Sequence, residues 1–204
     1  NLPTGRYTIQ TKVVDLDNNL KTYLSYEVPF YFSYPLYVVW SIDWEGWDVP
    51  GYELNEMANI SNQFQVPMTQ LFNPRIYLDP EKQKPNNPYI GVISKERAGF
   101  LTDWIRNRME QNGDEIGMHV HFFSDLLQEI GVNVFSDPII GAAYGDTRTS
   151  AYNQQDLEKI IDWGLQKFKE NDLPTPKIYR AGGWMASENL LKALENLGFI
   201  IDTS

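Results

Sequence analysis

The sequence predicts an α/β fold: a parallel sheet covered by helices and preceded by a short β-hairpin segment. Two observations support this prediction. From Pro35 onward, apolar β-type runs alternate with segments of helical periodicity, a pattern typical of a parallel sheet with flanking helices, closed as a barrel or open. Before Pro35, two β-rich stretches are separated by turn-forming residues 15–19. The boundary between 1–33 and 36–204 therefore separates a β-strand segment from an α/β domain.

The 1–33 segment contains two expected strands, 7–14 and 20–32, rich in β-branched and aromatic residues. Two strands are marginally stable alone, so they either pack on the following domain or form the end of a β-sandwich. Residues 2–7 resemble the approach to a late strand in immunoglobulin-like bacterial surface domains. We therefore expect further domains in a longer parent chain and an extracellular or cell-surface location. The start at Asn1, without an initiator Met or a leader, favours a processed piece.

The α/β part predicts strands and helices in alternation. The expected strands are 36–42, 66–72, 115–121, 177–180 and 199–202. The expected helices are 52–64, 94–111, 153–170 and 187–197. Ser94 is placed to cap the second helix and Gly113 to end it. The weakly periodic residues 122–150 are predicted to be a functional loop or lid.

Composition excludes several function classes. A formal net charge of −10 makes nucleic acid and anionic membranes poor partners. No run of about 18 apolar residues is present, so no membrane span is expected. The absence of cysteine excludes disulfides, thiolate metal sites and cysteine nucleophiles. Aromatic residues make up 14% of the chain, and they either fill the core or line a sugar-binding groove.

Acidic residues follow the first predicted strand of the α/β part. Asp43 and Glu45 flank Trp44 at the strand's C-terminal end, the face at which parallel α/β barrels hold their sites. Two carboxylates at this spacing point the same way, and a positive charge between them would keep both ionised. The alternative is a solvated loop with ordinary acidic residues.

Both histidines of the chain, His119 and His121, lie at the end of a later predicted strand. Residues i and i+2 of a strand project from one face about 7 Å apart, so both imidazoles can reach one ion. Imidazole with carboxylate suits Zn and related divalent metals. The alternative is two histidines that are neighbours by chance.

A third cluster follows the strand 177–180. Arg180 ends that strand, Gly182 and Gly183 permit a sharp turn, and Trp184 follows. Arg180 could hold a carboxylate or an oxyanion by forked hydrogen bonds. The alternative is a tight turn with a surface arginine.

Taken together, the clusters resemble the polysaccharide deacetylase (NodB-homology) family over about residues 36–204. The supporting phrases are 40–43, 66–72, 117–119, 180–184 and 197–199. The resemblance implies a distorted parallel (β/α) barrel, incomplete at its C-terminal end. It also implies a metal-dependent hydrolase that removes acetyl groups from N-acetylated sugars of a polysaccharide or glycan.

The resemblance assigns roles to individual residues. Asp43 would be the catalytic base and Arg180 would hold it. Glu45, His119 and His121 would bind a divalent metal, Zn or alternatively Co, Ni or Mn. Ring platforms for the sugar are expected at four aromatic positions: Trp44, Trp47, Tyr144 and Trp184.

The sequence departs from the family pattern in three ways. Trp44 occupies the place of the usual second acidic residue, and Glu45 comes one later. The family spaces its histidines four apart, but Phe123 stands there, so His121 is the substitute ligand, a residue that supports a ligand, or a substrate contact. The family's late aspartate and general-acid histidine would come after Ser204. The alternative function is therefore a non-catalytic glycan-binding or structural cell-surface protein.

Overall fold

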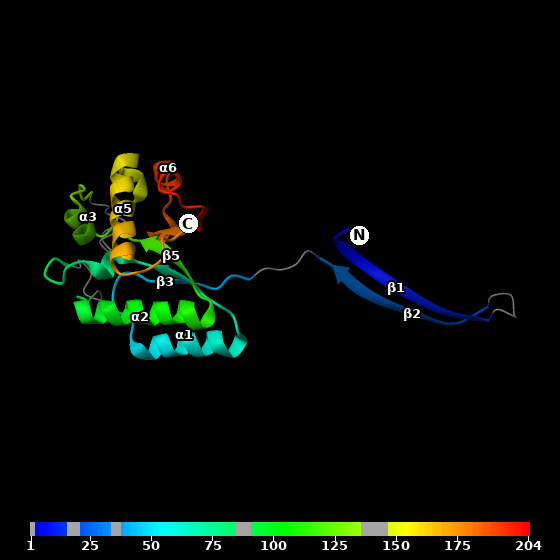
Figure 1. Cartoon of the computed structure of the whole chain (residues 1–204). Coiled ribbons are helices and arrows are strands. Elements are labelled where there is room, and N and C mark those ends of the chain that lie inside the picture. Colours follow the sequence, from blue (N-terminus) through cyan, green and yellow to red (C-terminus); the bar gives the residue numbers. More distant parts are fainter. Residues whose placement is uncertain (1–2, 16–20, 34–37, 85–90, 136–146) are drawn as a thin grey trace. The chain divides into compact units, whose positions relative to one another are not determined.

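The computed structural model describes residues 3–15, 21–33, 38–84, 91–135 and 147–204 (Figure 1). The chain divides into two compact units, Asn1–Val38 and Val39–Ser204. No helix in the described ranges is both long and apolar enough to cross a membrane.

The first unit is an antiparallel hairpin of β1 (Gly5–Asp15) and β2 (Lys21–Phe32). The pairing register places most of its apolar side chains on one face: Tyr7, Ile9, Val13, Tyr26, Val28 and Phe30. Several of these are exposed, including Ile9 at 55% and Val28 at 58%. The opposite face is polar, with Gln10 donating a hydrogen bond to Glu27. An amphipathic hairpin of this kind is suited to one layer of a sandwich, and its place in an immunoglobulin-like domain stays a prediction.

The second unit is built on a parallel sheet in the order β3-β4-β5-β6-β7. The strands are β3 (Ser41–Asp43), β4 (Thr69–Phe72), β5 (Glu115–Val120), β6 (Ile178–Ala181) and β7 (Ile201–Asp202). Successive strands are joined through α1 (Gly51–Phe64), α2 (Lys95–Asn112), α5 (Gln154–Glu170) and α6 (Glu188–Asn196). The predicted α/β class with a preceding hairpin is confirmed.

The sheet is strongly curved, as a bond between two distant strands shows. Arg180 of β6 donates a hydrogen bond of 2.7 Å to Asp43 of β3, although two strands separate them. In a flat sheet these strands would lie about 14 Å apart, which is further than the two side chains extend. On the same face, a Cβ at Gly117 would lie only 2.6 Å from Leu71. The inner face is therefore tightly packed, and closure into a full barrel stays a prediction.

The helix ends follow the sequence. Ser94 accepts a hydrogen bond from the Arg97 backbone at 3.2 Å, and Gly113 ends α2 in the left-handed conformation with φ 73°. Both predictions are confirmed.

Several predicted elements differ in extent from those observed, among them the strands expected at 66–72 and 199–202, which are shortened to Thr69–Phe72 and Ile201–Asp202, and two others differ most. The strand expected at 36–42 is reduced to Ser41–Asp43, because Val38 and Val39 are 77% and 76% exposed and pair with no strand in the part of the chain that is described. The loop expected at 122–150 contains α3 (Ser124–Ile130) and a 3₁₀ turn, η2 (Thr149–Ala151). Seven residues make too few turns for a clear helical period, so the pattern could not reveal α3.

Candidate metal site

Alternation along β3 places the two carboxylates together and the ring between them on the other side. Asp43 and Glu45 point to the inner face, while Trp44 lies in the core at 2% exposure. The Trp44 indole packs edge-on against Phe72 and donates a hydrogen bond of 2.8 Å to Gln70. A ring buried in this way offers no face to a sugar. The prediction that Trp44 is a sugar platform is therefore corrected: it is a core residue.

Glu45, His119 and His121 converge at the C-terminal edge of the sheet. Glu45 Oε2 lies 2.6 Å from His121 Nε2, and Glu45 Oε1 lies 3.9 Å from His119 Nε2. One potential ligand atom of each residue lies within 4.8 Å of the other two. The structure thus brings together the three side chains that the spacing placed on one face.

His119 has its free nitrogen aimed into this cluster. Its Nδ1 lies 2.9 Å from the backbone oxygen of Arg180, which can only accept, so the proton is on Nδ1 and the Nε2 lone pair is available. The Nε2 atom is buried and has no hydrogen-bond partner among the described residues. A histidine fixed from behind by a backbone carbonyl is the common arrangement of a metal ligand.

Packing holds the His121 ring in one place. The ring stacks on Phe123 with centroids 5.1 Å apart and an interplanar angle of 18°. On another side, a Cβ at Gly182 would lie 2.5 Å from His121 Nδ1. Glycine is therefore required at 182 for this ring position, which gives a structural reason for the first glycine of the third cluster.

Burial and nearby charges set the protonation of the cluster. Burial, and then the charge of His121, lower the pKa of His119, and this outweighs the opposing effect of the Asp43 and Glu45 carboxylates. His119 is therefore neutral near pH 7, the form that binds metals. Burial raises the pKa of Glu45, but the hydrogen bond and charge of His121 outweigh it, so the pKa is lowered overall. The Glu45 carboxylate is therefore ionised.

The three residues fit a divalent metal. Ligand atoms about 2.1 Å from one tetrahedral ion lie roughly 3.4 Å apart. One ligand atom of each residue lies within 4.8 Å of the other two, so small side-chain shifts would place all three around one ion. Two imidazoles and one carboxylate form a set known from catalytic zinc sites, in which three protein ligands leave a position open. The buried, unpartnered Nε2 of His119 is explained by such an ion.

Arg180 holds Asp43 beside this cluster. Its Nη1 donates to Asp43 Oδ1 at 2.7 Å and to Ser41 Oγ at 3.2 Å, and its Nε donates to Thr203 at 3.0 Å. The Asp43 and Arg180 side chains are 24% and 15% exposed, so the pair lies at the accessible edge of the site. The forked contacts join β3, β6 and the segment after β7, and they fix the Asp43 carboxylate.

The remaining predicted ring platforms are placed differently from one another. Trp47 is half-buried, with its ring 6.2 Å from Phe123. Trp184 is 69% exposed and lies in the turn after β6, two residues beyond Gly182. Tyr144 lies outside the described residues. The sugar-binding roles of Trp47, Tyr144 and Trp184 stay predictions.

Sequence reasoning missed a buried ion pair next to the site, formed by Arg75 and Asp125. Arg75 also donates a hydrogen bond to the backbone oxygen of Gly46, which follows Glu45 directly. Arg75 and Asp125 are 50 positions apart in the sequence, and no local spacing links them. Only the fold brings them together.

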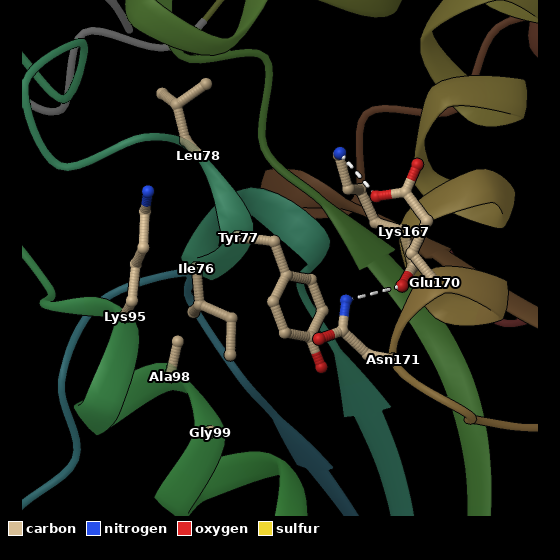
Figure 2. A pocket seen from close by; sticks show the side chains of 9 residues that line it. All are labelled: Ile76, Tyr77, Leu78, Lys95, Ala98, Gly99, Lys167, Glu170 and Asn171. Carbon is tan, nitrogen blue, oxygen red and sulfur yellow. Dashed lines mark hydrogen bonds and ion pairs between the residues drawn. The ribbon is translucent and has the colours of Figure 1, made fainter.

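A separate cavity of about 260 Å³ lies between α2, α5 and the 3₁₀ turn η1 (Pro74–Tyr77) (Figure 2). Its floor includes the Tyr77 ring, with Lys95 and Lys167 near its rim. Glu45, His119 and His121 do not line it. The cavity therefore belongs to the packing of the helices and not to the metal cluster.

No family model matches this sequence, and neither does any curated protein. Several solved structures are similar to it. A family 4 carbohydrate esterase from Streptomyces lividans, in complex with acetate, has a TM-score of 0.48 at 13% identity, and the match covers 81% of this chain and 60% of that one. A protein from Mycobacterium smegmatis described as a polysaccharide deacetylase has a TM-score of 0.44 at 18% identity over 73% of this chain and 36% of that one.

The third similar structure is the Xyl-CE4 domain of a multidomain xylanase from the hindgut metagenome of Trinervitermes trinervoides. It has a TM-score of 0.43 at 10% identity, covering 76% of this chain and 52% of that one. The chain thus spans at most 60% of these proteins. What it does must be argued from its own side chains.

Proposed function

We propose that this chain carries a metal-dependent hydrolase site that removes acetyl groups from N-acetylated sugars of a polysaccharide or glycan. The main support is the convergence of Glu45, His119 and His121 within 4.8 Å. A second support is the neighbouring Asp43 carboxylate, held by Arg180. The substrate class comes from the family that the sequence motifs resemble.

Glu45, His119 and His121 would hold the ion, which could be Zn, Co, Ni or Mn. When bound, a divalent ion polarises an amide carbonyl and lowers the pKa of an attacking water molecule from 15.7 toward about 7. His119 contributes through Nε2, since its Nδ1 is engaged by the Arg180 carbonyl. The lowered pKa of His119 keeps that nitrogen available near pH 7.

Asp43 is the proposed general base. Its Oδ1 is engaged by Arg180, whereas no hydrogen bond to its Oδ2 is found among the described residues. Oδ2 can therefore accept a proton from the water that attacks the acetyl carbonyl. Arg180 is the positioning residue that keeps this oxygen directed at the site.

The sugar would bind at the open edge of the sheet. Trp184 is the exposed ring nearest in sequence to the Gly182–His121 contact, and Trp47 lies beside Phe123, the stacking partner of His121. Flat rings at such places can stack on sugar faces. A glycan substrate also fits the extracellular or cell-surface location, which stays a prediction of the sequence.

The test pairs metal analysis of the purified protein with an acetate-release assay on N-acetylated oligosaccharides. We expect bound divalent metal and acetate release. Asp43→Asn should lower the rate about 10²- to 10⁴-fold, the usual contribution of a general base, while metal content is unchanged. His119→Ala should lose both metal and activity.

Asp103→Asn is the matched control, because Asp103 is an exposed acid in α2 that pairs with Arg106 at 2.6 Å. It should behave as the unaltered protein. Metal-free protein that binds glycan but releases no acetate would contradict the proposal. That outcome would favour the glycan-binding alternative.

A further inference from the structure

The Arg75–Asp125 pair is completely enclosed. Both side chains are 1% exposed. Arg75 Nε donates to Asp125 Oδ1 at 3.0 Å, and Arg75 Nη2 donates to Asp125 Oδ2 in a second, short bond. Removing two charges from water is costly, and a buried ion pair often stabilises a fold no more than apolar residues of the same volume. Stability alone therefore does not explain why this pair is buried.

The third nitrogen of the guanidinium reaches the loop that carries Glu45. Arg75 Nη1 donates a hydrogen bond of 2.8 Å to the Gly46 backbone oxygen. Gly46 has φ +85°, and a Cβ there would meet the Asn73 side chain at 3.0 Å and Arg75 Cβ at 3.1 Å. The turn after Glu45 is thus pressed against Arg75 and fixed by a charge-assisted hydrogen bond.

The same guanidinium also lies over the Phe123 ring. Arg75 Cζ lies 5.3 Å from the centre of the Phe123 ring, within the range of a cation–π contact. Phe123 in turn stacks on His121 at 5.1 Å. One side chain therefore contacts the supports of two of the three metal-binding residues.

Asp125 holds the Arg75 guanidinium in place. Its oxygens accept the two Arg75 bonds, and they also accept the backbone N–H groups of Leu126 at 2.8 Å and Lys84 at 3.1 Å. The carboxylate is thereby tied to the start of α3 and to the segment before the second helix. Arg75 cannot rotate away without leaving the buried Asp125 carboxylate without its charged partner.

We propose that the buried Arg75–Asp125 pair is a positioning device that sets the separation of Glu45 and His121 for metal binding. This inference rests on the proposed metal site. It predicts that replacing the pair weakens metal binding even when the fold is kept.

The experiment replaces both members of the pair at once, with Arg75→Met and Asp125→Leu in one variant. Paired replacement by apolar residues of similar volume is often neutral for stability, so this variant is suited to keep its fold. The matched control is Arg108→Met with Asp114→Leu. Arg108 and Asp114 form the other fully buried pair among the described residues, and their other hydrogen bonds go to Ser61, Asn62, Met68 and Gln70, not to Gly46 or Phe123.

Zn²⁺ and Co²⁺ are titrated into each metal-free protein by calorimetry, with the visible spectrum of Co²⁺ as a report of ligand geometry and thermal unfolding as a report of the fold. We expect the Arg75/Asp125 variant to bind about 10- to 100-fold more weakly with an altered Co²⁺ spectrum, the usual effect of losing support behind a ligand. The Arg108/Asp114 variant should bind as the unaltered protein does. Equal affinity in the two folded variants would overturn the proposal.

A third variant, Phe123→Leu, covers the case in which the paired replacement does not fold. It keeps the ion pair and removes only the ring between Arg75 and His121. Weaker Zn²⁺ binding in folded Phe123→Leu supports the positioning role, and unchanged binding overturns it. If the unaltered protein binds neither ion, the metal site itself is wrong, which is a different failure.

Discussion

Among the described residues, one arginine–aspartate pair is buried at each end of the parallel sheet. Arg75–Asp125 lies at the C-terminal edge, and Arg108–Asp114 lies where β4 and β5 begin. The two pairs have similar burial, with side-chain exposures of 1% and 1% against 5% and 0%. Burial alone therefore does not distinguish them.

Their neighbours differ. Asp114 accepts hydrogen bonds from the Met68 backbone and the Gln70 side chain, and Arg108 donates to Ser61 and Asn62 of α1. These contacts join strand starts to a helix. Arg75 instead contacts the loop after Glu45 and the ring beside His121. The comparison teaches that the same buried chemistry can hold the fold at one end of a sheet and a site at the other, in agreement with the division between the two faces of α/β barrels.

The largest expected effect is on stability, and it should be alike at both ends. Asp125→Ala and Asp114→Ala each leave a buried guanidinium unpaired, which costs about 3–5 kcal/mol. Chemical unfolding of the metal-free proteins measures this loss in the free energy of unfolding. A loss well below 1 kcal/mol at either position would show that water replaces the carboxylate there, and would break the equivalence of the two pairs.

A second contrast uses two glycines of the inner face. Gly117→Ala puts a methyl group 2.6 Å from Leu71, and overpacking of this kind costs about 1–3 kcal/mol. Gly182→Ala puts one 2.5 Å from His121 Nδ1, so the ring must leave its present position beside Glu45. We expect Gly117→Ala to lower the unfolding temperature with normal Zn²⁺ affinity, and Gly182→Ala to weaken Zn²⁺ binding. The reverse pattern would contradict the placement of His121.

Acid should affect the site end first, because both histidines lie there. Burial lowers the pKa of His119, whereas in the unfolded chain it titrates near 6.5. As pH falls below about 6.5 the unfolded state binds the proton first, so the stability that neutral His119 contributes is lost on acidification. Unfolding free energies of metal-free protein from roughly pH 7.5 to 5.5 should fall, and less steeply in His119→Gln. Parallel curves would exclude His119 as the cause.

The smallest effect on metal binding is expected at Tyr77, which lies in the same 3₁₀ turn, η1, as Arg75. Burial raises the pKa of Tyr77 to about 12, and its hydroxyl shares a 2.6 Å hydrogen bond with Thr102. The unfolded tyrosine ionises near 10, so stability should fall as pH rises from about 10 to 12. Tyr77→Phe should flatten this loss and leave Zn²⁺ affinity unchanged. An altered affinity would show that the whole turn, and not Arg75 alone, supports the site.

Local chemistry allowed much of the site to be predicted. The period of two along a strand puts Asp43 with Glu45 and His119 with His121, because both pairs lie two residues apart. The same alternation puts Trp44 on the opposite face, where its ring is buried in the core. The prediction of a sugar platform at Trp44 did not take this alternation into account. The caps at Ser94 and Gly113 were also predictable, because they depend on residues within one helical turn.

Other features could not be predicted, because they depend on which distant segments meet. The beginning of β3 was misplaced, because no sequence pattern reveals whether Val38 and Val39 gain a pairing strand. The Arg75–Asp125 pair joins residues 50 positions apart, and arginine and aspartate at that distance carry no periodic pattern.

By itself, the sequence determined the types of ligand and their places at strand ends, since side-chain chemistry and the strand period are local properties. Only the tertiary structure decided that Arg180 reaches Asp43 across two intervening strands and that Gly182 abuts His121. It alone decided that one buried arginine touches the supports of Glu45 and His121. Sheet curvature and ring packing are set by the whole core, and a short stretch of sequence does not contain them.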